Sequence, residues 1–296
     1  MANPTDLLVA KGSDIDAPID GGIERAASAA RAADVVHLAI GEATAMSGES
    51  ASRLDIVVPR AQQLLAEGVA ATGKPVVVIL RNGRALALEG AVRNAQAILV
   101  GWFLGTETGP ALADILFGNV SPSGRLPVTF PLATGQQPYY YARERSGRPA
   151  GPGSTAPFTS HFLGIPDEPL YPFGHGLTYS TVEYGPTRCS APTMTRDGEL
   201  AISAQVTNRG ARSVDEVVQL YIHDRVARVV QPVRRLVAFQ KVVLAGGASQ
   251  TVAFRIRATD LGFLDRVSKR VIEPGDFDVW IAPSAGAGQS ARFTLV

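Results

Sequence analysis

The chain has 296 residues with 28 basic and 27 acidic side chains, so its formal net charge is +1. This near-balance argues against a nucleic-acid-binding protein, which normally shows a basic excess. Hydrophobic residues make up 46% and charged residues 19% of the chain, a composition that builds a folded core. No apolar run reaches the roughly 18 residues that a membrane helix needs. The single cysteine, Cys189, has no partner for an internal disulfide.

Helical and strand patterns alternate along the first half of the chain. Ala-rich and amphipathic stretches predict helices at 22–33, 59–72 and 106–117, with Asp20 as a candidate N-cap of the first helix. Nearly continuous apolar runs predict strands at 34–41, 75–80 and 97–102, each buried on both faces. This alternation predicts an α/β domain with a mostly parallel sheet.

The pattern changes to a period of two from about Val182. Alternating polar and apolar residues predict strands that include 199–206, 217–222, 250–256 and 276–281, with turn residues between them. Roughly seven short strands in the last third of the chain are typical of an all-β immunoglobulin- or fibronectin III-like sandwich.

The stretch between the two patterns is rich in proline and glycine and holds three consecutive tyrosines, 139–141. Long segments of this kind are usually linkers or functional loops. We therefore divide the chain into an α/β domain over residues 1–135, a linker or junction over 136–180, and the sandwich over 181–296.

The loop after the first predicted strand is the best candidate for chemistry. It runs from Gly41 to Arg53 and contains Glu42 and Glu49. In parallel α/β sheets, ligand-binding groups lie in the loops beyond the carboxyl ends of the strands. The same residues also fit a solvated surface loop in which Arg53 pairs with Glu49 or Asp55.

The segment from Gly41 to Ile56, with Met-Ser-Gly-Glu-Ser at 46–50, resembles the acid/base loop of family 3 glycoside hydrolases, in the bacterial periplasmic β-glucosidase subgroup. The similarity covers nearly the whole chain, in order and with the right spacing. It continues through 72–84, 102–107, 118–127, 170–179 and 232–239, the last of which resembles the fibronectin-like module of the family.

The resemblance implies a retaining exo-β-glycosidase that removes terminal sugars, most often glucose, from a β-linked glucoside or oligosaccharide. Such enzymes use two carboxyl groups about 5–5.5 Å apart. The match makes Glu49 the general acid/base, with Glu42 as the alternative acid or a hydrogen-bonding residue at the strand end. Arg53 would support the loop and Met46 would form part of an apolar wall, whereas Trp102 would either stack on a sugar or pack in the interior. No cofactor or metal is implied.

One departure from the family limits these expectations. Family members carry the nucleophilic Asp on an N-terminal (β/α)8 barrel, which needs roughly 200 residues or more, and this sequence has no such region. The α/β domain also looks N-terminally truncated. We therefore expect negligible hydrolysis by this chain alone, with the missing barrel domain or chain as its partner.

Several properties are left open by the sequence. The alternative function is a non-catalytic carbohydrate-binding or scaffold remnant of the same fold. An oligomer is compatible with the sequence. The family implies a periplasmic or secreted protein, but residues 1–16 lack the features of a signal peptide and the compartment stays unknown.

Overall fold

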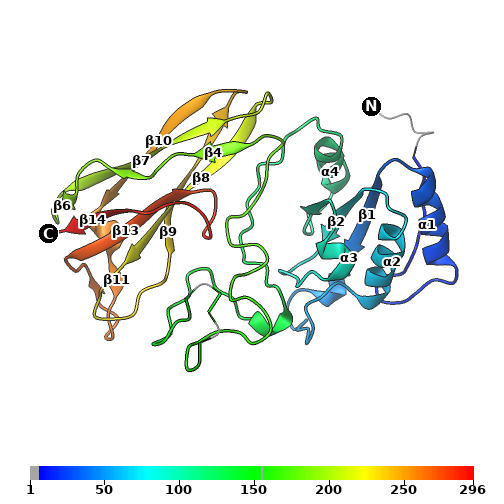
Figure 1. The fold of residues 1–296 in the computed structure, drawn as a ribbon, viewed down its shortest axis with the longest axis horizontal. Helices are drawn as coiled ribbons and strands as arrows, with labels where there is room; N and C mark the ends of the chain where they lie inside the picture. The colour runs from blue at the N-terminus through cyan, green and yellow to red at the C-terminus, as the bar shows by residue number, and fades with distance from the viewer. Residues whose placement is uncertain (1–6, 152, 155) are drawn as a thin grey trace. The chain divides into compact units, whose positions relative to one another are not determined.

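The computed structural model describes residues 7–151, 153–154 and 156–296, which form two compact units (Figure 1). The first unit comprises the chain up to Asn119 together with Phe130–Gln137, and the second comprises Val120–Thr129 and Pro138–Val296. The predicted fold class is confirmed, because the first unit is α/β and the second is an antiparallel sandwich. Most of the stretch expected to act as a linker belongs to the second unit.

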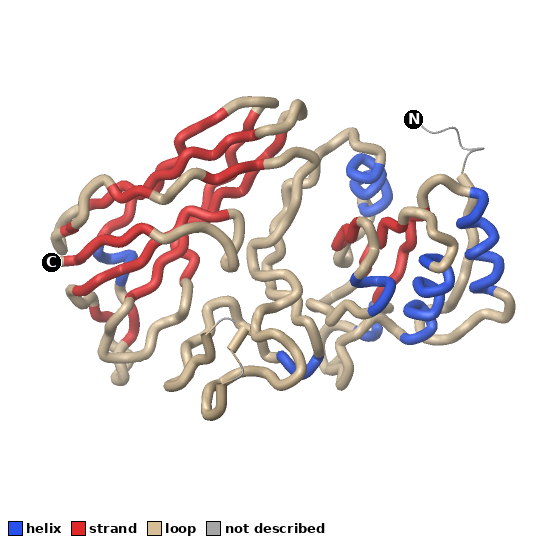
Figure 2. Tube along the Cα trace, viewed as in Figure 1, coloured by secondary structure: helices blue, strands red, loops and turns tan. Residues whose placement is uncertain are grey.

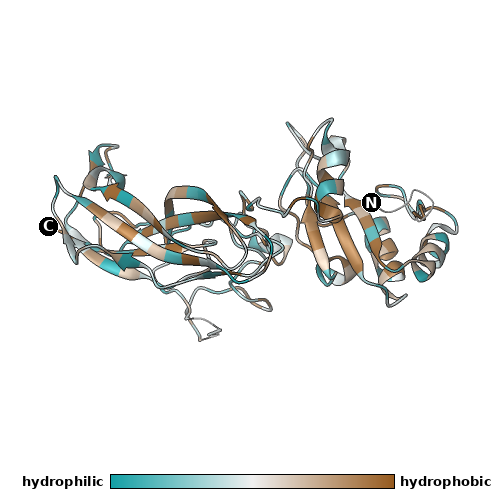
Figure 3. Ribbon diagram, turned by 90° about the horizontal axis from the view of Figure 1, so that it is seen from above, coloured by the Kyte–Doolittle hydropathy of each residue, from teal (hydrophilic) through white to brown (hydrophobic). Residues whose placement is uncertain are grey.

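A three-stranded parallel sheet forms the centre of the first unit. Its strands lie in the order β1 (Val36–Gly41), β2 (Val76–Arg81) and β3 (Ala97–Val100). The strands are mostly brown in Figure 3, as expected for a sheet rich in apolar residues. The helices of this unit are α1 (Gly22–Ala32), α2 (Arg60–Ala70), α3 (Gly90–Arg93) and α4 (Thr108–Leu116), with 3-10 turns η2 (Thr44–Met46) and η3 (Thr134–Gln136).

The N-cap predicted at Asp20 is wrong. Helix α1 begins at Gly22, and its N-cap is Gly21, with φ of 61° and no side-chain cap. A Cβ on Gly22 would lie 2.3 Å from the carbonyl oxygen of Gly12, so the preceding segment passes too close for any larger residue. This close approach sets the start of the helix, and a propensity argument does not detect it.

The second unit is built mainly of two facing sheets, with β11 and β12 as a separate two-stranded antiparallel sheet. One has the order β10-β7-β4, with β5 also paired to β7, and the other has the order β6-β14-β13-β8-β9. The pairings are antiparallel except for β14 with β6. The elements are β4 (Val182–Tyr184), β5 (Arg188–Cys189), β6 (Thr193–Met194), β7 (Glu199–Asn208), β8 (Val214–Asp224), β9 (Arg235–Leu244), β10 (Ser249–Arg257), α5 (Ala258–Leu261), β11 (Phe263–Leu264), β12 (Arg270–Val271), β13 (Gly275–Ala282) and β14 (Ala291–Leu295).

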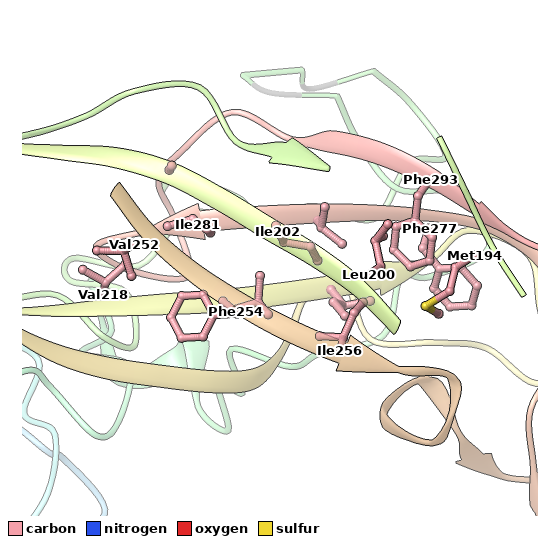
Figure 4. Close-up of a cluster of buried hydrophobic side chains, with 14 of the residues drawn as sticks. Met194, Leu200, Ile202, Val218, Val252, Phe254, Ile256, Phe277, Ile281 and Phe293 are labelled. Atoms are coloured by element: carbon pink, nitrogen blue, oxygen red, sulfur yellow. The ribbon is translucent and has the colours of Figure 1, made fainter. Parts of the chain in front are cut away.

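Both sheets contribute inward side chains to one hydrophobic core (Figure 4). Leu200 and Ile202 of β7 and Phe254 of β10 belong to this core together with Phe277 and Phe293, whose stacked rings have centroids 5.3 Å apart. Full burial of each such side chain stabilises the fold by about 1.5–3 kcal/mol. The alternation read from the sequence therefore marks the residues that hold the sandwich together.

Residues 120–129, 138–151, 153–154 and 156–180 of the second unit consist mostly of loop (Figure 2), yet buried polar contacts hold parts of this segment within the unit. Arg125 Nη2 lies 2.5 Å from Glu216 Oε2, and the Tyr184 hydroxyl donates to Glu216 Oε1 at 2.7 Å. The backbone N–H of Leu126 donates to the carbonyl of His175 at 2.8 Å. These contacts hold the segment in place, because it lacks the regular backbone hydrogen bonds of a helix or sheet.

Candidate active site

The candidate loop begins where β1 ends, at Gly41. This residue has φ of 143°, and a Cβ there would lie 1.8 Å from the carbonyl oxygen of Arg81. Only glycine fits such an approach. The next residue, Glu42, donates its N–H to that same carbonyl at 2.7 Å. The carboxyl ends of β1 and β2 are therefore joined directly.

Glu42 is a buried anchor, with 5% of its surface exposed. Its Oε1 accepts from Arg53 Nη1 at 2.9 Å, and its Oε2 accepts from the backbone N–H of Gly83 at 3.0 Å. Arg84 Nε lies 3.1 Å from Oε1 as an ion pair whose angle does not make a hydrogen bond. Donors on both oxygens leave this carboxylate engaged inside the protein.

The pairing considered for a solvated loop, Arg53 with Glu49 or Asp55, is wrong. Arg53 pairs with Glu42, eleven residues before it. Burial explains why Arg53 pairs with Glu42, because an unpaired buried carboxylate costs more free energy than an exposed one. Glu49 and Asp55 are both exposed to water.

Two arginines hold the loop by its main-chain oxygens. Arg53 Nη2 donates to the carbonyl of Val57 at 3.0 Å. Arg84 Nη2 donates to the carbonyl of Ala51 at 2.8 Å and also to that of Met46. A planar guanidinium with five N–H donors suits this multiple role.

Sequence reasoning did not single out Arg84. A detectable signal was present: an arginine just beyond one parallel strand lies beside the loop that leaves the neighbouring strand.

Glu49 lies in the opposite environment, at the tip of the loop. It occupies a turn from Gly48 to Ala51 that is closed by the N–H of Ala51 donating to the carbonyl of Gly48 at 3.2 Å. The next residue, Ser50, has φ of 60°, which gives the turn its sharp bend. Within the described part of the chain, no side chain or backbone group binds the Glu49 carboxylate.

The loops that follow all three parallel strands meet at Gly83. A Cβ on Gly83 would lie 1.9 Å from Ser47 Oγ, in the loop after β1, and 3.1 Å from the ring of Phe103, after β3. The Arg81 guanidinium lies 6.0 Å from the centre of the Phe103 ring. The sheet therefore gathers one loop from each strand at its carboxyl edge.

The remaining predicted residues border this edge. Met46 ends η2 and is half-buried, with its carbonyl bound by Arg84. Trp102 follows β3, its carbonyl accepts from Arg81 Nε at 2.7 Å, and its ring lies 6.0 Å from the ring of the fully buried Phe130. Over residues 7–151, 153–154 and 156–296, no three His, Cys, Asp or Glu side chains cluster as metal ligands would.

Comparison with known proteins identifies the family. Residues 2–179 match the Glycosyl hydrolase family 3 C-terminal domain, which covers more than half of the chain. The chain belongs to glycoside hydrolase family 3. Residues 216–285 of this family 3 chain match the fibronectin type III-like domain.

Similar proteins include the periplasmic β-glucosidase of Salmonella typhimurium, 42% identical over 93% of this chain and 36% of the relative. A β-xylosidase of Formosa agariphila is 35% identical over 97% of this chain and 39% of its own length. Among solved structures, a variant β-glucosidase from Listeria innocua in complex with laminaribiose has a TM-score of 0.90 at 35% identity, over 96% of this chain and 39% of that one. The family 3 chain thus spans between a third and two fifths of these relatives.

The family 3 chain combines a fixed carboxylate and a free one within a single loop. Both carboxylate oxygens of Glu42 accept hydrogen bonds, whereas Glu49 is exposed to solvent at the tip of the turn. Only a carboxyl group with an accessible oxygen can exchange a proton with a ligand.

No helix in the described part of the chain is long and apolar enough to cross a bilayer.

Proposed function

We propose that this chain supplies the acid/base half of a retaining β-glycosidase active site, with Glu49 as the general acid and base. The contrast between the two carboxylates of the loop carries this proposal. Glu42 is bound by the donors that fold the loop, so it has no oxygen to offer a substrate. Glu49 is exposed at the tip of the turn that those donors hold in place.

In the first step, the protonated Glu49 carboxyl group gives its proton to the glycosidic oxygen while a nucleophilic carboxylate attacks the sugar carbon and the aglycone leaves. In the second step, the Glu49 carboxylate takes a proton from the water that attacks the glycosyl-enzyme ester. The nucleophile would come from a (β/α)8 barrel domain or chain, without which this chain hydrolyses negligibly.

Terminal β-linked glucosyl residues are the proposed substrate class. The names of similar proteins support this choice, since a periplasmic β-glucosidase is 42% identical and a β-glucosidase crystal structure contains laminaribiose. Arg53 would act as a positioning residue, and Met46 would add an apolar wall. The packing of Trp102 against Phe130 supports an interior role for that ring over sugar stacking.

The first test is nitrophenol release from an aryl β-glucoside by the isolated chain and by its Glu49→Gln variant. We expect no turnover from either. Turnover by the parent chain that Glu49→Gln abolishes would show that the chain supplies its own nucleophile and would refute the half-site proposal.

The sharper test is a chimera in which this chain replaces the matching stretch of the Salmonella relative. The parent chimera should hydrolyse the aryl glucoside, and Glu49→Ala should lose about 10²–10⁴-fold in rate, the usual contribution of acid–base catalysis. Azide should rescue the variant, because a small nucleophile attacks the glycosyl-enzyme without a base and gives the β-glucosyl azide.

A matched control for the chimera is Glu67→Ala, at an exposed helix position, which should retain full activity. An active chimera that Glu49→Ala leaves unaffected would overturn the assignment of Glu49. An inactive chimera, together with glucose binding by the isolated chain, would favour the alternative, a non-catalytic carbohydrate-binding or scaffold remnant.

A further inference from the structure

Trp102 has an unusual backbone conformation for a bulky residue. It lies two residues beyond the end of β3, and its φ of 38° falls in the left-handed region. This region costs free energy for any residue with a Cβ and is rare for large side chains. Such strain persists only where the surrounding contacts impose it, and it is concentrated at functional sites. The contacts of Trp102, and the side chain that its turn directs, therefore bear on function.

Two contacts hold Trp102 in this conformation. The Nε–H of Arg81, the last residue of β2, donates to the Trp102 carbonyl at 2.7 Å. The indole ring lies 6.0 Å, between ring centres, from the fully buried ring of Phe130. The first contact fixes the main chain and the second fixes the side chain, so both parts of Trp102 are held.

The turn at Trp102 places the next side chain, Phe103, beside the loop that carries Glu49. The Phe103 Cε2 and Ser47 Oγ atoms lie 3.1 and 1.9 Å from the point that a Cβ on Gly83 would occupy. The two side chains are therefore neighbours over Gly83, and Ser47 is only two residues before Glu49. The Phe103 ring thus lies next to the residue that leads into the Glu49 turn.

Arg81 links this arrangement to the sheet. Its carbonyl accepts the N–H of Glu42, in the loop after β1, at 2.7 Å, whereas its side chain binds the loop after β3. Its guanidinium carbon lies 6.0 Å from the centre of the Phe103 ring. One residue at the end of β2 therefore contacts the loops that follow both neighbouring strands.

We propose that Arg81 and Phe103 are positioning residues for Glu49. Arg81 holds the left-handed turn at Trp102, and this turn sets the Phe103 ring against the loop that presents the Glu49 carboxyl group. The strain favours this role over simple packing, because a connection with no positional requirement can relax to an ordinary conformation. The catalytic consequence rests on the proposed function of Glu49, whereas the hold on the loop does not.

Hydrogen exchange of the full chain tests the hold on the loop without any glycosidase activity. The reporter is the N–H of Ala51, which closes the turn at the tip of the loop. Arg81→Met and Phe103→Ala should each accelerate its exchange at least about fivefold, because the turn opens more often once the ring is displaced or removed. The amide of Val78, inside β2, should keep its rate and so show that the sheet is intact.

Three further variants separate this route from general effects. Phe103→Tyr keeps the ring and should leave the exchange of Ala51 as in the parent chain. Phe117→Ala removes another exposed aromatic ring of the same unit, just after helix α4, and should also leave it unchanged. The double variant Arg81→Met with Phe103→Ala should exceed Phe103→Ala alone by less than about twofold, because both changes act through one ring.

The chimera with the Salmonella relative tests whether the hold matters for proton transfer. A β-glucoside of phenol, a poor leaving group, needs a proton from the general acid, whereas a β-glucoside of 2,4-dinitrophenol does not. Arg81→Met and Phe103→Ala should therefore lower kcat/KM for the phenyl glucoside at least about tenfold more than for the dinitrophenyl glucoside. Phe117→Ala should lower neither.

Three results would overturn the proposal. The first is unchanged exchange of Ala51 in Arg81→Met and Phe103→Ala, and the second is a double variant in which the two accelerations multiply. The third is an active chimera in which these variants lower kcat/KM equally for both glucosides, as a merely structural role would. The proposed function fails on a different result, an active chimera that Glu49→Ala leaves unaffected, so the two proposals can be told apart.

Discussion

In the described part of the chain, each unit buries one glutamate against arginine, and the two clusters differ in what they hold. Glu42 lies at the end of a parallel strand, and its partners Arg53 and Arg84 keep 20% and 23% of their side chains exposed. Glu216 lies near the start of β8, and its partner Arg125 is only 8% exposed. The first cluster shapes a loop at the surface, whereas the second fixes a connecting segment in the interior. Burial should therefore make the second cluster the more sensitive to loss of one partner.

The largest effect is expected for Glu216→Ala. This change leaves the Arg125 guanidinium buried without its counter-charge, which should lower the free energy of unfolding by about 3–5 kcal/mol. Urea denaturation followed by tryptophan fluorescence measures it. The double variant Arg125→Met with Glu216→Leu should lose far less, because no lone charge remains. An equal loss in both variants would mean that packing, not charge, is responsible.

A smaller effect is expected for Glu42→Ala, about 3 kcal/mol, because its two arginines can turn partly toward water. Amide exchange across 43–57 should also accelerate, since Arg53 and Arg84 would lose the carboxylate that orients them. The control is Glu67→Ala, which removes an exposed pair with Arg60 and should cost less than about 1 kcal/mol. Unchanged exchange in the loop would show that Glu42 does not organise it.

The smallest effect is a pH dependence at His175, beside the interior cluster. Burial, and then the positive charge of Arg125, lower the pKa of His175 below its ordinary value of 6.5. Below pH 6.5 the unfolded chain therefore binds a proton more readily than the folded chain, and stability falls as the pH drops through that value. His175→Phe, which can keep the ring stack on Tyr171, should reduce the loss of stability between pH 7.5 and 5.5. An unchanged pH slope would contradict this origin.

Most of the fold was predictable because its two halves have different periods. Nearly continuous apolar runs predicted β1, β2 and β3, and alternation predicted β7, β8, β10 and β13. Strand β9 was not singled out. Its pairing with β8 shifts register at Val237, where a bulge breaks the two-residue period that the prediction used.

The candidate site was predictable only where it is local in sequence. The loop and its two glutamates follow from the position of a strand end. The partner of Arg53 does not, because it depends on which carboxylate is buried. The contacts of Arg84 with residues 33 and 38 positions earlier depend on the register that places Gly41 beside Arg81. The proton-transfer role of Glu49 remains a prediction.

The hydrogen bonds from Arg84 to the loop bear on which substitutions the loop can accept. Its contacts with Met46 and Ala51 are made to carbonyl oxygens, which every amino acid carries. Mutations that replace the side chains at these two positions therefore preserve the hydrogen bonds from Arg84, provided that the new residues tolerate the same backbone conformation. Natural variation or directed evolution can remodel the surface of the loop while one distant arginine preserves its course.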